Sequence, residues 1–352
     1  MTNPQWMIYG ANGYTGELIA REAARRGMAP VLAGRRADSI AALAGELGLQ
    51  HRAFALDDPA EVPRQLAGMK LVLHCAGPFS STSAPMVEAC LAARAHYLDI
   101  TGEIGVFEHA HAQHARAQAA GIVVCPGVGF DVIPTDCVAA ALKDALPDAT
   151  HLALGFDSRT RMSPGSAKTA VESMATGGKV REDGRIVTVP PAHRVRTIDF
   201  GDGEKLATTI PWGDVSTAFH STGIPNIELY IPATRGMISG MKRMHYLRWV
   251  LALAPVQKFL KARIAKSVKG PSADKRGRAP TYVWGEASNA AGGKKTARIR
   301  IPNTYDITIT GALAVAEHLL GARPAPGAYT PSRLLGADLV TRLPECGPMR
   351  IT

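Results

Sequence analysis

Three glycines, spaced as Gly10-Ala-Asn-Gly13-Tyr-Thr-Gly16, constrain the fold of this chain more than any other feature. They follow the apolar run Gln5–Gly10, which predicts a strand, and they open the helical pattern of Gly13–Arg26. A glycine turn between a first strand and a first helix is typical of a dinucleotide-binding domain. There Gly10 would make the tight bend, Gly13 would let the backbone approach a pyrophosphate, and Gly16 would allow close packing of helix on strand.

The first third of the chain continues this pattern, with short apolar runs that alternate with helices. Strands rich in Val, Ile and Leu that alternate with helices predict a parallel sheet covered on both faces. Residues 1–130 are therefore expected to form a Rossmann-type, doubly wound domain. The clearest helices are Gly13–Arg26 and Gly105–Ala120, and the predicted strands are Gln5–Gly10, Pro30–Arg35, His51–Leu56, Lys70–Ala76, His96–Ile100 and Gly121–Cys125.

A length of 352 residues suggests about two domains, and the pattern changes after about residue 150. Glycine turns at residues 182–184, 201–203 and 291–293 separate several apolar runs, which predicts antiparallel hairpins. We expect an inserted α+β substrate domain over residues 131–303, with C-terminal helices in residues 304–352 that return to the Rossmann domain. The predicted strands are Ile186–Val189, His193–Phe200, Lys205–Ile210, Asn226–Ile231, Thr281–Ala287 and Thr296–Ile301; the predicted helices are Ser166–Thr176, Met237–Val268, Thr304–Leu320 and Pro331–Arg342.

The end of the second predicted strand indicates which dinucleotide is bound. Enzymes that use NAD usually carry an acid there, which bonds the ribose 2′-hydroxyl. Here the strand ends in Arg35 and Arg36, and no carboxylate is present. Because guanidinium groups bind phosphate through charge-assisted bidentate hydrogen bonds, this pair predicts NADP(H). The alternative for Arg36 is that it only begins a solvated helix.

Other residues of the nucleotide site are expected from their places after the strands. Carboxyl ends of parallel strands are where ligands bind in such sheets. Within the glycine turn these residues are Asn12, Tyr14 and Thr15; Asp57 ends the third strand near the adenine, and Ala76, Gly77 and Pro78 end the fourth strand near the nicotinamide.

Together these segments resemble the saccharopine dehydrogenase-like superfamily, especially the branch that includes trans-acting enoyl reductases. The resemblance spans nearly the whole chain and implies a Rossmann domain, completed by C-terminal helices, with an inserted substrate domain. It leaves the substrate open, because members act on very different molecules. The matching segments are the glycine turn, Ala33-Gly-Arg-Arg36, Cys75-Ala-Gly-Pro-Phe79, Tyr97-Leu-Asp-Ile-Thr-Gly-Glu103, Pro126-Gly-Val-Gly-Phe-Asp-Val-Ile-Pro-Thr-Asp136 and Gly327-Ala-Tyr-Thr-Pro331.

Acidic residues after the fifth and sixth strands are the candidates for proton transfer. Asp99 and Glu103 follow the fifth strand, and Asp131 and Asp136 follow the sixth. The resemblance places Asp131 at a position similar to an active-site aspartate of saccharopine reductases, so it is our catalytic candidate. Its alternative role is that of a turn or N-cap residue that organises the crossover between domains. A further candidate is the segment from Ser163 to Thr169, whose helix start and lysine would face an anionic substrate group.

Two other reductase classes and a metal site are disfavoured. Short-chain dehydrogenases need a lysine four residues after a tyrosine, and no tyrosine in this chain has one. Reductases that form a thioester need a cysteine after the glycine, whereas Cys125 precedes Pro126-Gly127. His109, His111 and His114 lie in one predicted helix without a carboxylate cluster, so no metal is expected.

The charge distribution sets apart one segment. The chain carries a net charge of +10, and no acid occurs between Glu228 and Asp274, where nine cations surround the apolar run Trp249–Val256. This run of eight residues is far shorter than the ~20 needed to span a bilayer. The segment is interpreted as a solvated surface helix, an interfacial membrane helix or a rim that attracts an anionic, acyl-bearing substrate.

Composition places the protein in the cytoplasm, with peripheral membrane association as an option. Five cysteines without a Cys-x-x-Cys pair indicate reduced thiols, and no signal peptide is expected at the start of the sequence. We expect a small-molecule substrate and no nucleic acid, with an anionic membrane and a second copy of the chain as further candidate partners. The predicted function is NADP(H)-dependent hydride transfer to or from an enoyl, imine or related carbon. The alternative is a lipid-associated binding protein that keeps this fold without turnover.

Overall fold

The computed structural model describes residues 5–159, 177–247, 249, 253–267 and 280–352. Within these residues the chain divides into two compact units. The first contains residues 1–133 and 305–335, and the second contains residues 134–304 and 336–352. The predicted helix Ser166–Thr176 and the segment Ser163–Thr169 lie outside the described residues.

The first unit is built on a seven-stranded sheet in the order β15-β6-β5-β4-β1-β2-β3. All of its pairings are parallel. Strands β1, β2 and β4 are buried throughout, because helices cover both faces of the sheet. The strands are β1 (Trp6–Tyr9), β2 (Val31–Gly34), β3 (His51–Ala53), β4 (Leu71–His74), β5 (His96–Asp99), β6 (Val123–Cys125) and β15 (Gly327–Ala328).

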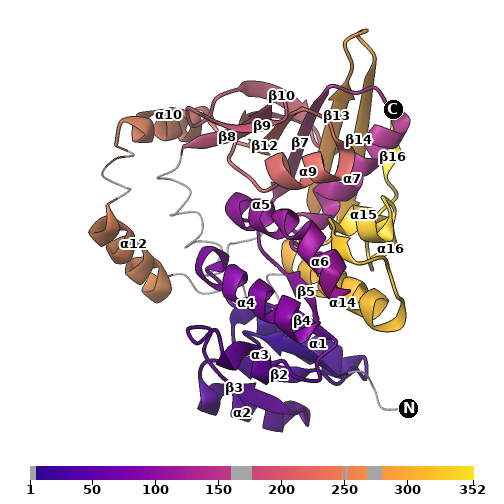
Figure 1. Cartoon of the computed structure of the whole chain (residues 1–352). Helices are drawn as coiled ribbons and strands as arrows, with labels where there is room; N and C mark the ends of the chain where they lie inside the picture. The colour runs from indigo at the N-terminus through magenta and orange to yellow at the C-terminus, as the bar shows by residue number, and fades with distance from the viewer. Residues whose placement is uncertain (1–4, 160–176, 248, 250–252, 268–279) are drawn as a thin grey trace. The chain divides into compact units, whose positions relative to one another are not determined.

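Alternating side chains of these strands enter two apolar layers. Met7 and Tyr9 of β1 belong to a core cluster that also holds Val62, Met86 and Ala117 from the helices on that face. The helices of this unit are α1 (Tyr14–Arg25), α2 (Ala37–Leu47), α3 (Glu61–Gln65), α4 (Phe79–Ala93), α5 (Ile104–Ala112), α6 (His114–Ala120), α14 (Thr304–Gly321) and α15 (Pro331–Leu335) (Figure 1).

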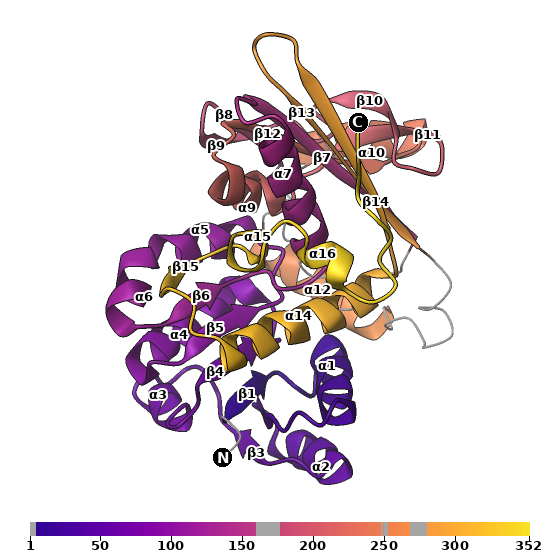
Figure 2. The same ribbon diagram turned by 90° about the vertical axis from the view of Figure 1, so that its right-hand side faces the viewer.

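Helix α14 returns to the first unit and lies beside α1 (Figure 2). The rings of Tyr14 and Tyr305 meet edge to face with centroids 5.1 Å apart, and Arg26 forms an ion pair with Glu317 at 3.4 Å. The second contact lies twelve residues after the first in both helices, from Tyr14 to Arg26 and from Tyr305 to Glu317. Helices α1 and α14 therefore run in the same direction.

The second unit is built on a mixed sheet in the order β10-β11-β12-β7-β13-β14-β16, with β8 paired to β12 and β9. The three predicted hairpins are present as β8–β9, β10–β11 and β13–β14. The strands are β7 (His151–Ser158), β8 (Gly178–Glu182), β9 (Arg185–Val189), β10 (Val195–Asp199), β11 (Glu204–Thr209), β12 (Asn226–Pro232), β13 (Thr281–Ser288), β14 (Lys294–Ile301) and β16 (Arg350–Ile351); the helices are α7 (Ile133–Ala145), α9 (Asp214–Thr222), α10 (Arg235–Met244), the 3-10 turn η1 (His245–Leu247), α12 (Ala254–Ser267) and α16 (Leu339–Arg342).

The predicted fold class is therefore confirmed: a parallel Rossmann-type sheet with helices, and a second unit with a mixed sheet. The end of the chain differs from the expectation. Residues 336–352 belong to the second unit and not with the returning helices, because β16 pairs with β14.

Three helices predicted as single are broken. Gly105–Ala120 divides at Gln113, and Pro331–Arg342 divides at Gly336, whose φ of +95° no helix accommodates. The described residues of Met237–Val268 include α10, η1 and α12. Its last helix starts next to Pro255, which lacks the N–H that a helix interior needs.

Candidate nucleotide and active site

The glycine turn has the close backbone contacts that the motif predicts. Gly10 has a φ of +83°, and a Cβ at this position would lie 2.7 Å from the Ala76 nitrogen. A Cβ at Gly16 would meet the Gly10 carbonyl oxygen and lie 3.0 Å from the Ala11 Cα. Helix α1 begins after Gly13, and no side-chain hydrogen bond caps its start. This geometry fits a bound pyrophosphate.

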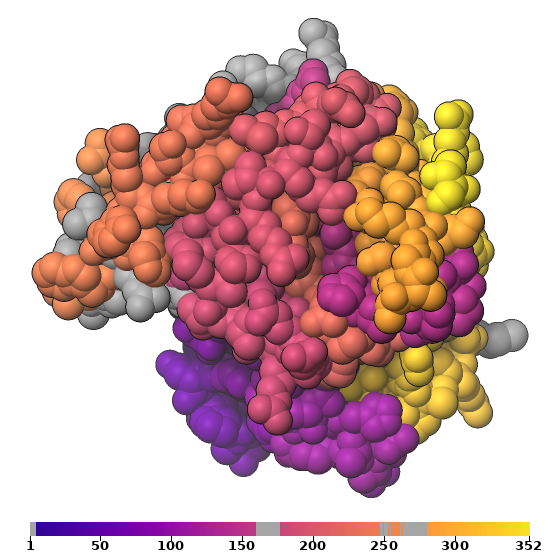
Figure 3. All heavy atoms as spheres, turned by 90° about the horizontal axis from the view of Figure 1, so that it is seen from above, coloured from indigo at the N-terminus to yellow at the C-terminus, as the bar shows by residue number. Residues whose placement is uncertain are grey.

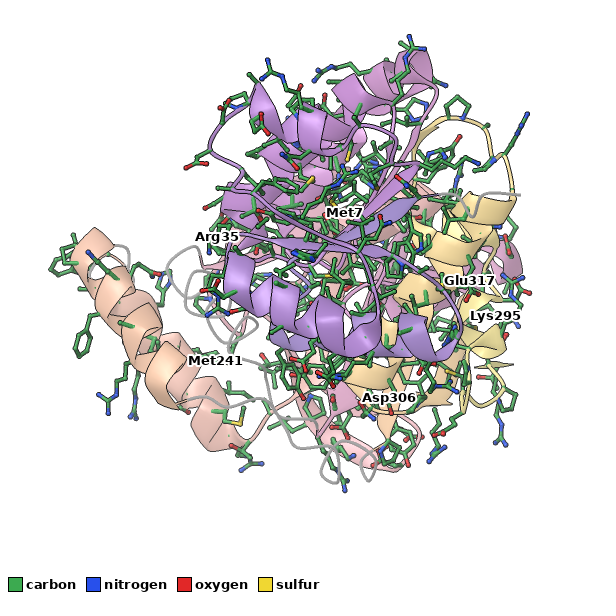
Figure 4. The ribbon with its side chains drawn as sticks, turned by 90° about the horizontal axis from the view of Figure 1, so that it is seen from below. Met7, Arg35, Met241, Lys295, Asp306 and Glu317 are labelled. Atoms are coloured by element: carbon green, nitrogen blue, oxygen red, sulfur yellow. The ribbon has the colours of Figure 1, made fainter. Side chains whose placement is uncertain are left out.

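The predicted arginines are exposed where β2 ends. Arg35 lies near Tyr9: burial raises the pKa of the Tyr9 hydroxyl to about 12, while the Arg35 charge opposes that rise and the Asp57 charge adds to it. Arg35 and Asp57 thus approach the same point at the ends of β2 and β3. Arg36 stands at the N-cap position of α2 without a side-chain capping bond. Figure 4 shows Arg35 at the edge of the first unit, whereas Met7 lies inside it.

The neighbouring aspartates after β3 have different surroundings. The Asp58 carboxylate accepts hydrogen bonds from the backbone nitrogens of Ala60, at 2.9 Å, and Glu61, at 3.2 Å. Asp58 therefore stabilises the start of α3. The Asp57 side chain is exposed at the same strand end as Arg35, which leaves it the better placed of the two for a ligand.

The loop after β4 is held by a buried histidine and by an acid. The ring of His74 bonds the Thr82 hydroxyl at 3.0 Å, and this hydroxyl donates to the Ala76 carbonyl oxygen at 2.6 Å. Glu103 accepts hydrogen bonds from the backbone nitrogens of Phe79, at 3.1 Å, and Ser80, at 2.7 Å. These contacts define the backbone of Ala76, Gly77 and Pro78, which borders the glycine turn.

Asp131 lies in the turn after β6, against the loop that follows β5. A Cβ at Gly102 would lie 2.7 Å from Asp131 Oδ2 and 3.1 Å from its Cγ, so only a glycine leaves room for this carboxyl. Burial raises the pKa of Asp131 from 3.8 to about 7. A carboxyl with such a pKa holds its proton at near-neutral pH and can donate it.

The candidate residues therefore follow one edge of the sheet. In the strand order, Asp57 follows β3, Arg35 follows β2, Gly10 follows β1, Ala76 follows β4 and Asp131 follows β6. Adjacent strands are about 4.8 Å apart, so β2 and β6 are about 19 Å apart across the sheet. An extended NADP(H) molecule along this edge would have its 2′-phosphate at Arg35 and its nicotinamide toward Asp131.

The remaining acidic candidates have structural partners. Asp99 is buried, and it accepts hydrogen bonds from the Tyr97 hydroxyl at 2.7 Å and the Gly127 nitrogen at 2.8 Å. Burial raises the pKa of Asp99 to about 6. Asp136 belongs to the second unit, where the Ser221 hydroxyl donates to its carboxylate. Asp131 stays the catalytic candidate of the sequence analysis, with a pKa that burial raises to about 7.

Helix α14 supplies two side chains that the sequence analysis did not assign to the site. Tyr305 contacts Tyr14 at the start of α1, and the Thr308 hydroxyl accepts a hydrogen bond from the Phe130 nitrogen at 3.1 Å. Both contacts hold loops that carry candidate residues. These contacts join residues far apart in the sequence, so no local signal marks them.

The contacts of Cys75 and His114 do not favour a catalytic role for either side chain. Burial raises the pKa of the Cys75 thiol well above its usual range, so the reactive thiolate is disfavoured. His114 bonds the Ala328 nitrogen at 3.1 Å and thereby fixes β15. Within the described ranges no group of His, Cys, Asp or Glu side chains forms a metal site, and no helix is long and apolar enough to cross a bilayer.

Comparison with known proteins gives an independent view of the first unit. Residues 6–125 match the family model of the saccharopine dehydrogenase NADP binding domain. The trans-acting enoyl reductase of Mycobacterium tuberculosis is 31% identical over 202 residues, which cover 52% of this chain and 48% of that protein. A probable mitochondrial saccharopine dehydrogenase-like oxidoreductase of Arabidopsis thaliana is 29% identical over 200 residues, or 50% of this chain and 44% of that protein.

A solved structure has the same fold over nearly the full chain. Apo saccharopine dehydrogenase (L-Glu forming) from Saccharomyces cerevisiae matches with a TM-score of 0.67 at 10% identity, and the match covers 99% of this chain and 100% of that one. At this identity the match concerns the fold alone. In sequence, the chain spans about half the length of the trans-acting enoyl reductases that it matches.

Proposed function

We propose that this protein, whose residues 6–125 match the model of the saccharopine dehydrogenase NADP binding domain, is an NADP(H)-dependent oxidoreductase. It would transfer hydride to or from an enoyl, imine or related carbon. The observation that carries the proposal is the row of Arg35, the glycine turn and Asp131 along one sheet edge. When bound, the nicotinamide supplies or accepts the hydride.

The residues of this chain would supply orientation and a proton. The glycine turn and the start of α1 would hold the pyrophosphate, while Arg35 would bind the 2′-phosphate. The loop Ala76–Pro78, fixed by Thr82 and Glu103, would border the nicotinamide. The Asp131 carboxyl, with a pKa near 7, would donate a proton to the substrate or remove one from it.

Cofactor preference is the first test of this assignment. NADPH is expected to bind at least about tenfold more tightly than NADH, a difference of about 1.4 kcal/mol, because Arg35 pairs with the 2′-phosphate. Arg35→Asp is expected to remove most of this difference in calorimetric titrations. Arg323→Asp is the matched control, since Arg323 is an exposed cation beyond the far end of α14. Equal affinity of the wild-type protein for both cofactors would contradict the proposal.

The second candidate function is a lipid-associated binding protein without turnover. Five exposed apolar side chains favour it: Met237, Tyr246, Trp249, Leu253 and Phe259. Oxidation of NADPH with enoyl, keto and imine substrates distinguishes the two. Stoichiometric NADPH binding without oxidation of any substrate in such a panel would favour the binding protein.

We also propose that the substrate is a small molecule rather than a nucleic acid. A cytoplasmic location is proposed because all five cysteines are free thiols in the structure.

A further inference from the structure

Exposed apolar side chains are concentrated in one segment of the second unit. Seven large apolar side chains are exposed in the part of the chain that the structure describes, and five of them lie between residues 237 and 259. Tyr246 is 78% exposed and Trp249 is 68% exposed, so these rings are almost as open to water as in an unfolded chain. The other three are Met237, Leu253 and Phe259. Such a concentration marks an interaction surface rather than ordinary scatter.

These side chains are not the inner face of a packed helix. Helix α10 already contacts its own unit through Ile238 and Met241, which pack with Ala192, Leu206 and Ala233. Met237 is on the same helix, yet it is exposed. Figure 4 labels Met241, and Figure 3 shows orange side chains of this segment that stand out into solvent.

Helix α12 has a similar outward apolar stripe. Val256, Phe259 and Leu260 occupy positions i, i+3 and i+4, which share one face of a helix. None of the side chains described on this helix, at residues 255–260, 262 and 263, is buried. The helix therefore leaves its apolar positions accessible to a partner.

The charge of the segment indicates the nature of that partner. No acidic residue occurs from Leu229 to Ala273. Exposed cations are described at Arg235, Lys242, Arg243, Lys258 and Arg263, interspersed with the exposed apolar residues. Cations alone would suit any polyanion. Cations mixed with Trp, Tyr, Phe and Leu suit a surface that is anionic outside and apolar within, which is a bilayer.

We propose that residues 235–247, 249 and 253–263 bind peripherally to the surface of an anionic lipid bilayer. Trp249, Tyr246 and Phe259 enter the interface, where aromatic rings with a polar atom or a large apolar area are favoured. The cations lie at the level of the lipid headgroups, and the long Lys and Arg stems cover apolar surface. This inference concerns the second unit and does not depend on the proposed oxidoreductase activity.

Flotation with lipid vesicles tests the proposal on the full chain. The probes are vesicles of phosphatidylcholine alone and of equal parts phosphatidylcholine and phosphatidylglycerol. Wild-type protein is expected to float with the anionic vesicles at low salt and to be released as salt screens the charges. Each cation at an anionic surface contributes about fivefold in affinity, so the variant K242E/R243E/K258E is expected to bind at least about 100-fold more weakly. W249S/F259S is expected to bind about tenfold more weakly.

The matched control is R185E/R300E, which reverses two exposed cations of the same unit outside the segment. It is expected to float like wild type, and all variants are expected to keep the wild-type thermal midpoint and NADPH affinity. Trp249 also serves as a probe, since Trp6 and Trp284 are buried and Trp212 is half-buried. Anionic vesicles should protect its fluorescence from iodide quenching.

Three results would overturn the proposal. One is wild-type protein that stays at the bottom of the gradient with anionic vesicles at low salt. Another is equal binding to neutral vesicles, because charge would then have no part. The third is a wild-type dimer in sedimentation that W249S/F259S dissociates, without vesicle binding, since the apolar face would then be covered by a second copy.

Discussion

Gly102→Ala is expected to displace the Asp131 carboxyl while leaving the rest of the site in place. The added Cβ would lie 2.7 Å from Asp131 Oδ2, whereas ordinary contacts begin at 3.4 Å, so the carboxyl must move by about 0.7 Å. Gly102 does not have a positive φ, and alanine is compatible with its backbone. Because the contact is with the far end of a side chain, we expect a loss in stability of no more than about 1 kcal/mol.

The effect on turnover is expected to be much larger than the effect on stability. A misplacement of this size in a reacting group lowers a rate by about 10- to 100-fold. NADPH oxidation with a substrate from the enoyl, keto and imine panel should fall by this factor, and Asp131→Asn should lower it at least as much. Calorimetry should give an NADPH affinity within about twofold of wild type, because the glycine turn and Arg35 are unchanged.

Gly105→Ala is the matched control, since a Cβ at Gly105 would have no neighbour within 4 Å. It lies in the first turns of α5, only three residues away, and should keep full turnover. Wild-type turnover in Gly102→Ala would refute the view that the position of Asp131 matters. Loss of NADPH binding together with turnover would show that Gly102 acts on the nucleotide instead.

Two further predictions concern aspartates. Asp58→Ala is expected to lower the free energy of unfolding by about 1 kcal/mol in urea titrations without affecting NADPH affinity, because it removes the carboxylate that bonds the Ala60 and Glu61 nitrogens before α3. Asp57→Ala should weaken NADPH binding without lowering the free energy of unfolding. Identical behaviour of the two variants would contradict this division of roles. Since the pKa of Asp131 is raised to about 7 in the folded state, its contribution to stability falls as the pH rises from about 4 to about 7. Asp131→Asn should therefore increase the free energy of unfolding, measured in urea titrations, by up to about 4 kcal/mol at about pH 8. At about pH 4 the same substitution should change it by almost nothing. An increase that does not depend on pH would argue against the raised pKa of Asp131.

The sequence predicts the parallel sheet well because its strands carry a strong local signal. Strands β1, β2 and β4 are short runs of buried, mostly apolar residues, as in Val31–Gly34. Strand β7 was missed for the opposite reason. It contains a glycine and no β-branched residue, so its propensity is weak. It forms a strand because β12 and β13 pair with it on both sides.

Helix α9 was missed for a similar reason. Its sequence Asp-Val-Ser-Thr-Ala-Phe-His-Ser-Thr is rich in Ser, Thr and Val, which favour helices weakly. Burial of Val215 and Ala218 stabilises the helix in spite of this. Tertiary contacts of this kind leave no local pattern in the sequence.

Sequence reasoning proposes site residues where a residue follows a strand, because strand ends meet at one edge of the sheet. This reasoning selects Arg35, Asp57 and Asp131. It also selects Asp99 and Asp136, whose hydrogen-bond partners Gly127 and Ser221 are distant in sequence and leave no local signal. The contacts of Tyr305 and Thr308 are also long-range and carry no local signal.

The return of β15 to the edge of β6 has a consequence for biosynthesis. The ribosome releases residues 1–133 before it has made residues 305–335, which complete the same unit. At about 5–20 residues per second the intervening chain takes about 10–30 s to synthesise. For that time β6 has an open edge and Thr308 is not yet present to bond Phe130. An open edge can pair with other nascent chains. A protein truncated before Tyr305 would keep the open edge of β6. We therefore expect the nascent first unit to bind chaperones until residues 305–335 are made.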